Sequence, residues 1–232
     1  GLPAERKPVD TRIVECELTH KQREIYDKLQ YELISEVEGG LLVASIPLVK
    51  LLRLRQVTLG EPCMVYDPET VMDSVTFDPN CPSRKLDMLN ALIEKHHAHD
   101  KVLVFTSSQR FANAVAHRVC AKTALYTGAQ TAKARSEAFA GFTEGDVQVL
   151  LCTIGAAAEG LDGLQRVCHV EVWLDEDLNG MLCEQAKGRL NRMGQPAERI
   201  IRYYFQALDT MDDGTFQRLA GQAQANRAAL NK

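Results

Sequence analysis

Long apolar runs are missing from this sequence of 232 residues. No stretch of about 18 apolar residues occurs, so a membrane-spanning helix is excluded. The first residues lack the apolar stretch of a secretory signal, and the chain does not begin with Met. We therefore expect an intracellular protein, cytoplasmic or, in a eukaryote, nuclear, and not a secreted one. We also expect the sequence to be a fragment excised from a longer chain.

Cysteine spacings typical of disulfide-rich or zinc-binding proteins are missing too. The chain has seven cysteines, an odd number, and no Cys-x-x-Cys. This pattern indicates neither a disulfide framework nor a zinc knuckle, and it favours a reducing compartment. His96, His97 and His99 cluster without a cysteine or carboxylate at ligand spacing, so we predict no metal site.

A phosphate-binding loop of the form Gly-x-x-x-x-Gly-Lys-Ser/Thr is also absent. The chain therefore has no segment of this kind for holding the phosphates of a nucleotide. Residues 171–177 are apolar and then acidic, a pattern that can hold magnesium beside such a loop. Because the loop is missing, we interpret these acids as stabilising the N-terminus of the following helix, where negative charge is favourable.

The composition is that of a folded protein, with 45% hydrophobic and 25% charged residues. The formal net charge is −4, from 27 basic and 31 acidic residues, so the overall charge does not indicate a nucleic-acid binder. One segment departs from this balance. Between Gly39 and Gly60 the only charged residues are Lys50, Arg53 and Arg55, which makes this segment a candidate for contacting phosphates.

Residues 1–82 have the pattern of a lead-in and a small helical protrusion. A polar strand is expected at 11–18, followed by a helix that Thr19 and Gln22 begin with a capping box. Apolar residues then recur every four positions and predict one helix face that ends before Gly39; they are Ile25, Leu29, Leu33 and Val37. A second helix is predicted over 48–57. Residues 60–82 are rich in proline and are interpreted as an irregular connection.

From Ser83 the pattern becomes regular and predicts an α/β domain over residues 83–232. Ser83 begins a helix, and short apolar runs then alternate with helical patterns, which predicts a parallel sheet with helices on both faces. The predicted strands are 101–106, 123–126, 147–152, 168–174 and 200–205, and the later helices are 109–120, 131–143, 178–193 and 213–229. Ligands of such sheets bind at the carboxyl ends of the strands, so we expect the chemistry in the loops after residues 106, 126, 152 and 174.

The most informative segment is 185–195. Helical spacing places Gln185, Arg189 and Arg192 on one face. A second face is apolar and is predicted to pack on the sheet; it consists of Leu182, Ala186, Leu190 and Met193. Two rigidly held arginines suit a polyanion, because a guanidinium binds phosphate through several hydrogen bonds. A solvated basic face is the alternative interpretation.

This segment resembles motif VI of superfamily two helicases, and its Arg-x-x-Arg-x-Gly-Gln form resembles the Swi/Snf-type DNA-dependent ATPases. Further stretches resemble that family in the same order along nearly the whole chain: 2–3, 18–22, 51–56, 83–86, 101–109 (motif IV), 158–162 (motif V) and 175–179. The sequence also departs from the family. Asn191 stands where His is usual, Leu178 and Gly180 replace an aromatic residue and a proline, and motif V after Thr153 is one residue longer.

The resemblance implies a RecA-like lobe, the second of two. ATP with Mg²⁺ would be held mainly by a first lobe that this fragment lacks, so the fragment would bind no cofactor tightly and would be inactive alone. Arg189 and Arg192 would be arginine fingers, which stabilise charge on the transferred phosphoryl group. Gln185 and Gly160 would line the ATP cleft, and Asp162 would approach the nucleotide sugar.

The resemblance also implies contacts with the DNA backbone, which position a protein without reading bases. The matching residues at strand ends are Ser107, Thr127, Gly128 and Thr153, and the basic residues Lys50, Arg53 and Arg55 add to them. The expected partners are duplex DNA and the N-terminal RecA-like lobe of the same parent chain, with no membrane. We therefore expect the second lobe of a DNA-dependent ATPase and translocase. Two alternatives stay open: a stand-alone nucleic-acid-binding or regulatory module without catalysis, and half of an RNA helicase.

Overall fold

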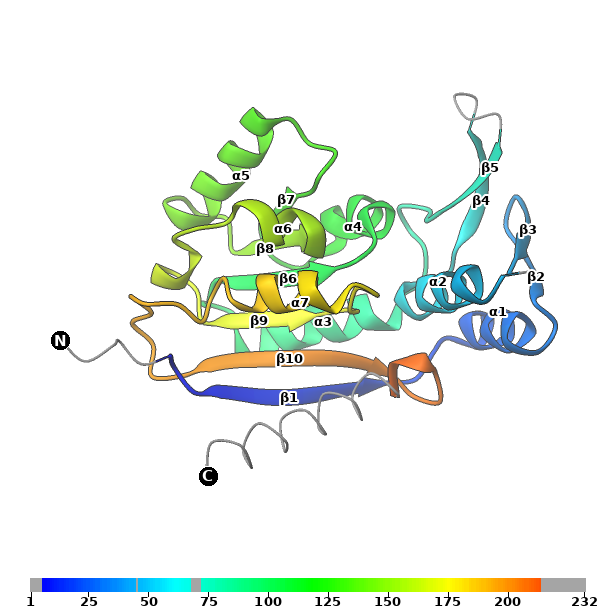
Figure 1. Cartoon of the computed structure of the whole chain (residues 1–232), viewed down its shortest axis with the longest axis horizontal. Helices are drawn as coiled ribbons and strands as arrows, with labels where there is room; N and C mark the ends of the chain where they lie inside the picture. The colour runs from blue at the N-terminus through cyan, green and yellow to red at the C-terminus, as the bar shows by residue number, and fades with distance from the viewer. Residues whose placement is uncertain (1–5, 45, 68–71, 214–232) are drawn as a thin grey trace.

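The computed structural model describes residues 6–44, 46–67 and 72–213. Its centre is a six-stranded sheet in the order β1-β10-β9-β6-β8-β7, and every neighbouring pair is parallel. The strands are β1 (Val9–Cys16), β6 (Val102–Thr106), β7 (Thr123–Tyr126), β8 (Val149–Thr153), β9 (Val170–Trp173) and β10 (Ile200–Ala207). The predicted α/β class with a parallel sheet is confirmed (Figure 1).

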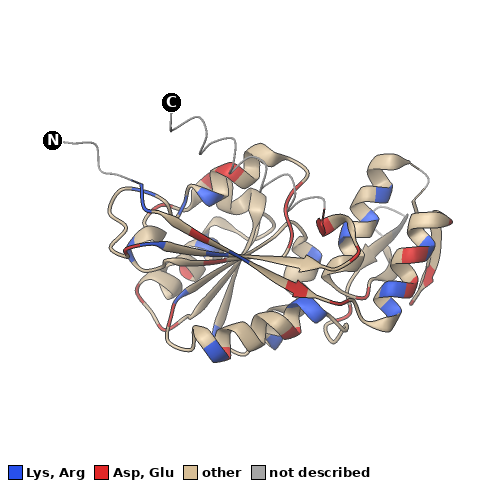
Figure 2. Ribbon diagram, turned by 90° about the horizontal axis from the view of Figure 1, so that it is seen from below, with Lys and Arg blue, Asp and Glu red and all other residues tan. Residues whose placement is uncertain are grey.

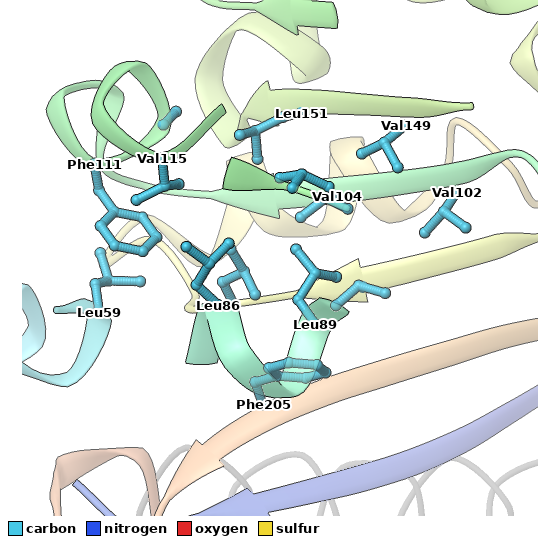
Figure 3. Close-up of a cluster of buried hydrophobic side chains, with 14 of the residues drawn as sticks. Leu59, Leu86, Leu89, Val102, Val104, Phe111, Val115, Val149, Leu151 and Phe205 are labelled. Atoms are coloured by element: carbon cyan, nitrogen blue, oxygen red, sulfur yellow. The ribbon is translucent and has the colours of Figure 1, made fainter. Parts of the chain in front are cut away.

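Each face of the sheet carries its own core, because side chains alternate along a strand. Val102 and Val104 of β6 pack on one face with Leu89 of α3 (Arg84–His96) and Val115 of α4 (Gln109–Val115), as Figure 3 shows. The opposite face is covered by α5 (Ala132–Thr143), α6 (Ile154–Gly160) and α7 (Gly180–Lys187). Burial on both faces explains why the central strands are continuous apolar runs.

Helix starts were predicted well and helix lengths less well. The Ser83 side chain accepts from the backbone N–H of Leu86 and begins α3 as expected. The helix predicted over 109–120 continues beyond α4 only as a 3₁₀ turn at Ala116–Arg118, and the one predicted over 178–193 ends at Lys187. Helix α6 was not predicted. The helix expected over 213–229 lies outside the described residues apart from its first residue.

The lead-in contributes directly to the lobe. Strand β1 pairs with β10 along its full length, from Val9 opposite Ile200 to Cys16 opposite Ala207, and the two strands run side by side in Figure 1. The sheet therefore crosses the division that the sequence placed near residue 82. The division into residues 1–82 and 83–232 stays a prediction.

The protrusion begins as predicted with α1 (His20–Tyr31), which has the capping box of Thr19 and Gln22. Its predicted continuation through Val37 is wrong, because Leu33 has a φ of 64° and the chain then turns back. Strands β2 (Ile34–Val37) and β3 (Gly40–Val43) form an antiparallel hairpin instead. A Cβ on Gly39 would lie 2.1 Å from the carbonyl oxygen of Met64, so the turn requires glycine there.

The segment predicted to be irregular contains a second hairpin. Helix α2 (Pro47–Leu59) leads to β4 (Cys63–Asp67) and β5 (Met72–Thr76), which pair antiparallel. Pro62, Pro79 and Pro82 lie outside these strands, and Pro68 lies outside the described residues. Proline density marked the limits of the hairpin rather than an absence of structure. No helix in the described ranges is long and apolar enough to cross a membrane.

A buried polar network joins the protrusion to the lobe. Lys85 of α3 is fully buried, and its Nζ donates to the carbonyl of Leu174 (2.5 Å) and to Asp212 (2.7 Å). Asp175, next along the chain from Leu174, accepts from Thr106 Oγ1 (2.9 Å). Arg55 of α2 lies 3.7 Å from Asp175. Burial raises the pKa of Asp175, and the charges of Arg55 and Lys85 oppose that rise.

Replacing Lys85 tests this network. Lys85→Ala leaves Asp212 and the Leu174 carbonyl without their buried donor, and we expect a loss of about 3–5 kcal/mol in unfolding free energy. Denaturant unfolding measures it. Lys122→Ala is the control, because its pair with Asp146 is short (2.6 Å) but largely exposed, and it should change stability little. Equal, small losses for both variants would show that the junction is held by apolar packing alone.

Candidate functional site

The segment after α7 forms a folded loop, residues 188–195, which we call the arginine loop. The backbone N–H of Arg192 donates to the carbonyl of Leu190 (3.0 Å), and Gly194 has a φ of +86°. The amide of buried Gln195 donates to the carbonyl of Cys168 (2.9 Å), just ahead of β9. The prediction of one helix face carrying Gln185, Arg189 and Arg192 is therefore wrong, because the helix ends before the arginines.

The apolar side of this segment is only partly as predicted. Ala186 and Leu190 are buried against the sheet, and Leu182 packs beside them. Met193, predicted to pack with them, is 73% exposed because it lies on the turn that Gly194 closes.

Arg189 is bonded to the end of α6. Its guanidinium donates to the carbonyls of Ala158 and Leu161, the latter at 3.3 Å. Carbonyls at a helix C-terminus lack intrahelical partners, and a cation there is favourable. The Nε of Arg189 is buried without a hydrogen-bond partner, and burial together with nearby Arg192 lowers the pKa of Arg189. Arg189 thus joins the arginine loop to the segment that carries Gly160 and Asp162.

Arg192 points in a different direction. Its guanidinium donates to Asp162 Oδ1 (2.7 Å), and the two side chains are 41% and 80% exposed. Both groups therefore remain open to solvent and to a ligand. The structure brings Arg189, Arg192, Gly160 and Asp162 together from the two segments that resemble motifs V and VI, while Gln185 lies exposed on α7.

A shallow hollow surrounds the Arg192 side chain. It is lined by two arginines, two amides, one acid and one methionine: Arg6, Arg192, Gln165, Asn191, Asp162 and Met193. Arg6 comes just before β1 and Asn191 comes before β10, so the hollow lies beside the amino-terminal ends of these strands. We expected the functional residues at the carboxyl ends of the strands, and this cluster lies elsewhere. Two guanidinium groups and two amides in one hollow suit an oxyanion.

Gly160 lines a second hollow on the same face of the sheet. A Cβ there would lie 2.9 Å from the hydroxyl of Tyr126. Arg135 of α5 and Glu159 of α6 line the same hollow. The absence of a side chain at Gly160 keeps this space open between α5 and α6.

The strand-end residues lie at the opposite edge of the sheet, as their positions after β6, β7 and β8 require. Ser107 donates both its N–H (2.8 Å) and its hydroxyl to Asp175. Thr127 and Thr153 are 1% and 8% exposed, whereas Gly128 is exposed. In this arrangement the hydroxyl of Ser107 bonds within the lobe.

The basic segment also differs from the expectation. Arg55 is buried, donates to the carbonyl of Glu176 (2.8 Å) and pairs with Asp175, so it does not belong to a basic surface. Asp175, the acid that pairs with Arg55, is distant in sequence but adjacent in space. Lys50 donates to the carbonyl of Gln30 (2.6 Å) at an exposed position, and Arg53 is half-buried. Figure 2 shows basic and acidic residues interleaved over the molecule.

Within the described part of the chain, no three His, Cys, Asp or Glu side chains are arranged to hold a metal ion. In the histidine cluster, buried His97 contacts Asp100 through Nδ1 (2.8 Å) and the hydroxyl of Tyr203 through Nε2 (2.9 Å). These contacts give His97 a structural role.

Residues 84–194 match the family model of the helicase conserved C-terminal domain. The matched stretch is just under half of the chain, so this part of the chain is similar to a helicase C-terminal domain. No curated protein shows significant sequence similarity to the chain. Residues 84–194 include the loop with Arg189 and Arg192 and the segment with Gly160 and Asp162.

Several solved structures share the fold of this chain. The C-terminal part of the Fun30 ATPase domain superposes with a TM-score of 0.66 at 15% identity, covering 92% of this chain and 90% of that one. The SWI2/SNF2 ATPase core of Sulfolobus solfataricus in complex with dsDNA gives 0.65 at 18% identity, covering 91% of this chain and 44% of that one. The isolated C-terminal domain of that ATPase gives 0.58 at 16%, covering 91% and 85%. The predicted RecA-like fold is confirmed, since these structures share it over nine-tenths of this chain.

The two arginines should differ in their effect on stability. Arg189→Ala removes the donors from two helix-end carbonyls and should lower the unfolding free energy by about 1–2 kcal/mol. Arg192→Ala breaks only an exposed pair and should cost less. Chemical denaturation of both variants decides the order. A larger loss for Arg192→Ala would mean that the Arg189 contacts to α6 contribute little.

Proposed function

We propose that this chain is the second lobe of a DNA-dependent ATPase and translocase. The supporting observation is the exposed pair of Arg192 and Asp162, held 2.7 Å apart within a helicase C-terminal domain. ATP with Mg²⁺ would be bound mainly by a first RecA-like lobe of the same parent chain. The chain spans 44% of the dsDNA-bound SWI2/SNF2 core that it resembles, which is consistent with a lobe that needs a partner lobe.

In this proposal Arg192 acts as an arginine finger. Its guanidinium is exposed and is held by one exposed carboxylate, so a phosphate oxygen can replace Asp162 as its partner. An arginine finger is worth about 10³–10⁵-fold in the rate of related NTPases, because it stabilises charge that develops on the transferred group. Asp162, once released, would accept hydrogen bonds from the hydroxyls of the nucleotide sugar.

The other residues implied by the resemblance take unequal parts. Gly160 would leave room for the nucleotide beside α6, and exposed Gln185 would line the cleft. To act as a second finger, Arg189 must leave the carbonyls of Ala158 and Leu161. We therefore propose that Arg192 provides most of the charge stabilisation and that Arg189 provides the smaller part.

DNA would bind at the other edge of the sheet and on the protrusion. The candidates there are Gly128, with an exposed backbone, and the basic pair Lys50 and Arg53. Thr127 and Thr153 are nearly buried, so their contribution would come after a local rearrangement on binding. One structural neighbour is a SWI2/SNF2 core in complex with dsDNA, which supports duplex DNA as the partner. A protein that acts on DNA would work in the cytoplasm or the nucleus.

An ATPase assay tests the finger. The 232-residue chain alone should release no phosphate above background. In the full-length protein, Arg192→Ala should lower DNA-stimulated turnover by at least ~10²-fold while ATP binding weakens much less. Lys at this position should rescue poorly.

Arg84→Ala is the matched control, because Arg84 also forms an exposed pair, with Asp87 at 3.8 Å. It should leave turnover unchanged. Parental turnover in Arg192→Ala would exclude the finger role. Turnover by the isolated chain that persists through further purification would contradict a two-lobe site.

A salt titration tests the DNA surface. The chain should bind duplex DNA weakly and without sequence preference, with a log–log salt slope of roughly −2 to −4. Lys50→Ala and Arg53→Ala should each make the slope shallower by about 1, whereas Lys122→Ala on the lobe should leave it unchanged. Absence of binding at ~50 mM salt, or preference for one sequence, would contradict the proposed surface.

A further inference from the structure

Asn191 binds the backbone of a residue 184 positions away. The side-chain amide oxygen accepts from the N–H of Lys7 (3.0 Å), and the amide nitrogen donates to the carbonyl of the same residue (3.2 Å). These two bonds lie just ahead of the sheet, where the N–H of Ile200 donates to the carbonyl of Pro8 (3.0 Å). The segment that leads into β1 is thus fixed to the arginine loop by one side chain.

The same segment reaches the hollow around Arg192. Arg6, next to Lys7, lines that hollow together with Asp162 and Arg192. Asn191 is the immediate chain neighbour of Arg192. Any displacement of residues 6–7 therefore acts on the residue that precedes the proposed finger.

Long-range hydrogen bonds hold the arginine loop at several points. Arg189 donates to carbonyls at the end of α6, Gln195 donates to the carbonyl of Cys168, and Asn191 binds Lys7. Among the described residues, the Arg192 side chain has one hydrogen-bond partner, the exposed carboxylate of Asp162. Its position is consequently set by the neighbours that fix the loop. Asn191 lies on one side, and on the other side the carbonyl of Met193 accepts from Gln165 Nε2 at 3.4 Å.

We propose that Asn191 is a positioning residue, which fixes the arginine loop to the incoming segment and so sets the position of Arg192. This inference rests on the proposed function. In a two-lobed parent the first lobe precedes Lys7, so a movement of that lobe reaches Arg192 through these two hydrogen bonds. We call the two hydrogen bonds between Asn191 and Lys7 the clamp. Misplacement of a catalytic group by about 1 Å can cost 10²-fold in rate, so loss of the clamp should lower the rate measurably.

The chain offers a matched control for the experiment. Asn90 of α3 also binds backbone with both ends of its amide: it donates to the carbonyl of Arg118 (3.0 Å) and accepts from the N–H of Cys120 (3.0 Å). Asn90 lies on α3, which covers the other face of the sheet, away from the arginine loop. Removing either amide costs the same kind of hydrogen bonds, and only one of them touches the loop.

We compare Asn191→Ala and Asn90→Ala in the full-length protein by steady-state kinetics, thermal melting and amide hydrogen exchange. Asn191→Ala should lower kcat for ATP by ~10-fold or more, with KM changed much less, and should accelerate exchange over residues 189–195. Asn90→Ala should lower the melting temperature by a similar amount and change neither kcat nor exchange in that loop. Asn191→Asp keeps the acceptor and loses the donor, so it replaces Asn191→Ala if that variant does not fold.

The outcomes separate this inference from the proposed function. If Asn191→Ala keeps parental kcat while Arg192→Ala loses activity, the clamp is wrong and the finger stands. A lower kcat without faster exchange in 189–195 would also overturn the clamp. If the full-length wild type hydrolyses no ATP, the proposed function fails, and exchange decides alone: acceleration confined to Asn191→Ala supports the clamp, and unchanged exchange overturns it.

Discussion

The buried ammonium group of Lys85 is the interaction on which the arrangement of this molecule depends. Lys85 is inside the protein, where a charge is tolerated only when it is paired and hydrogen-bonded. Its partners come from the end of β9, through Leu174, and from Asp212 after β10, and Thr58 of α2 lies 3.4 Å away. Since each partner belongs to a different element, satisfying this one group fixes the protrusion, the sheet and α3 relative to one another.

Asp175 extends the same network to the carboxyl edge of the sheet. It accepts from Thr106 and Ser107 and pairs with Arg55. Residues that looked suited to phosphate contacts therefore satisfy one another in the folded lobe. This explains how Arg55, a basic residue in a segment without acids, becomes buried: the compensating charge of Asp175 comes from the loop after β9, far along the chain.

The other edge of the sheet is organised differently. There Arg189 and Asn191 bond to backbone carbonyl or amide groups, whereas Arg192 stays half-exposed beside Asp162. The bonded groups hold the loop against the lobe, and the exposed guanidinium keeps its capacity for a ligand. Placing the rigid contacts at neighbouring positions allows a short irregular loop to present one arginine in a defined direction.

Local signals in the sequence determined most of the elements. The caps at Thr19 and Ser83 were readable because a helix start depends on residues within one turn. The buried runs of β6 and β8 were readable because strands covered on both faces are continuously apolar. The same local signals failed at Leu33: apolar residues spaced by four predicted a continuing helix, but the backbone turns there. They also failed for 60–82, where the prolines mark the limits of a hairpin.

For the site, the motifs grouped Gln185 with Arg189, Arg192, Gly160 and Asp162. The fold brings the last four together and leaves Gln185 exposed on α7. Only the tertiary structure decided what each side chain binds. The contact of Asn191 with Lys7 spans 184 residues, and the pairing of Arg55 with Asp175 joins the protrusion to the lobe. Such contacts depend on the path of the whole chain through the sheet order, whereas periodicity and capping report only on neighbours a few residues apart.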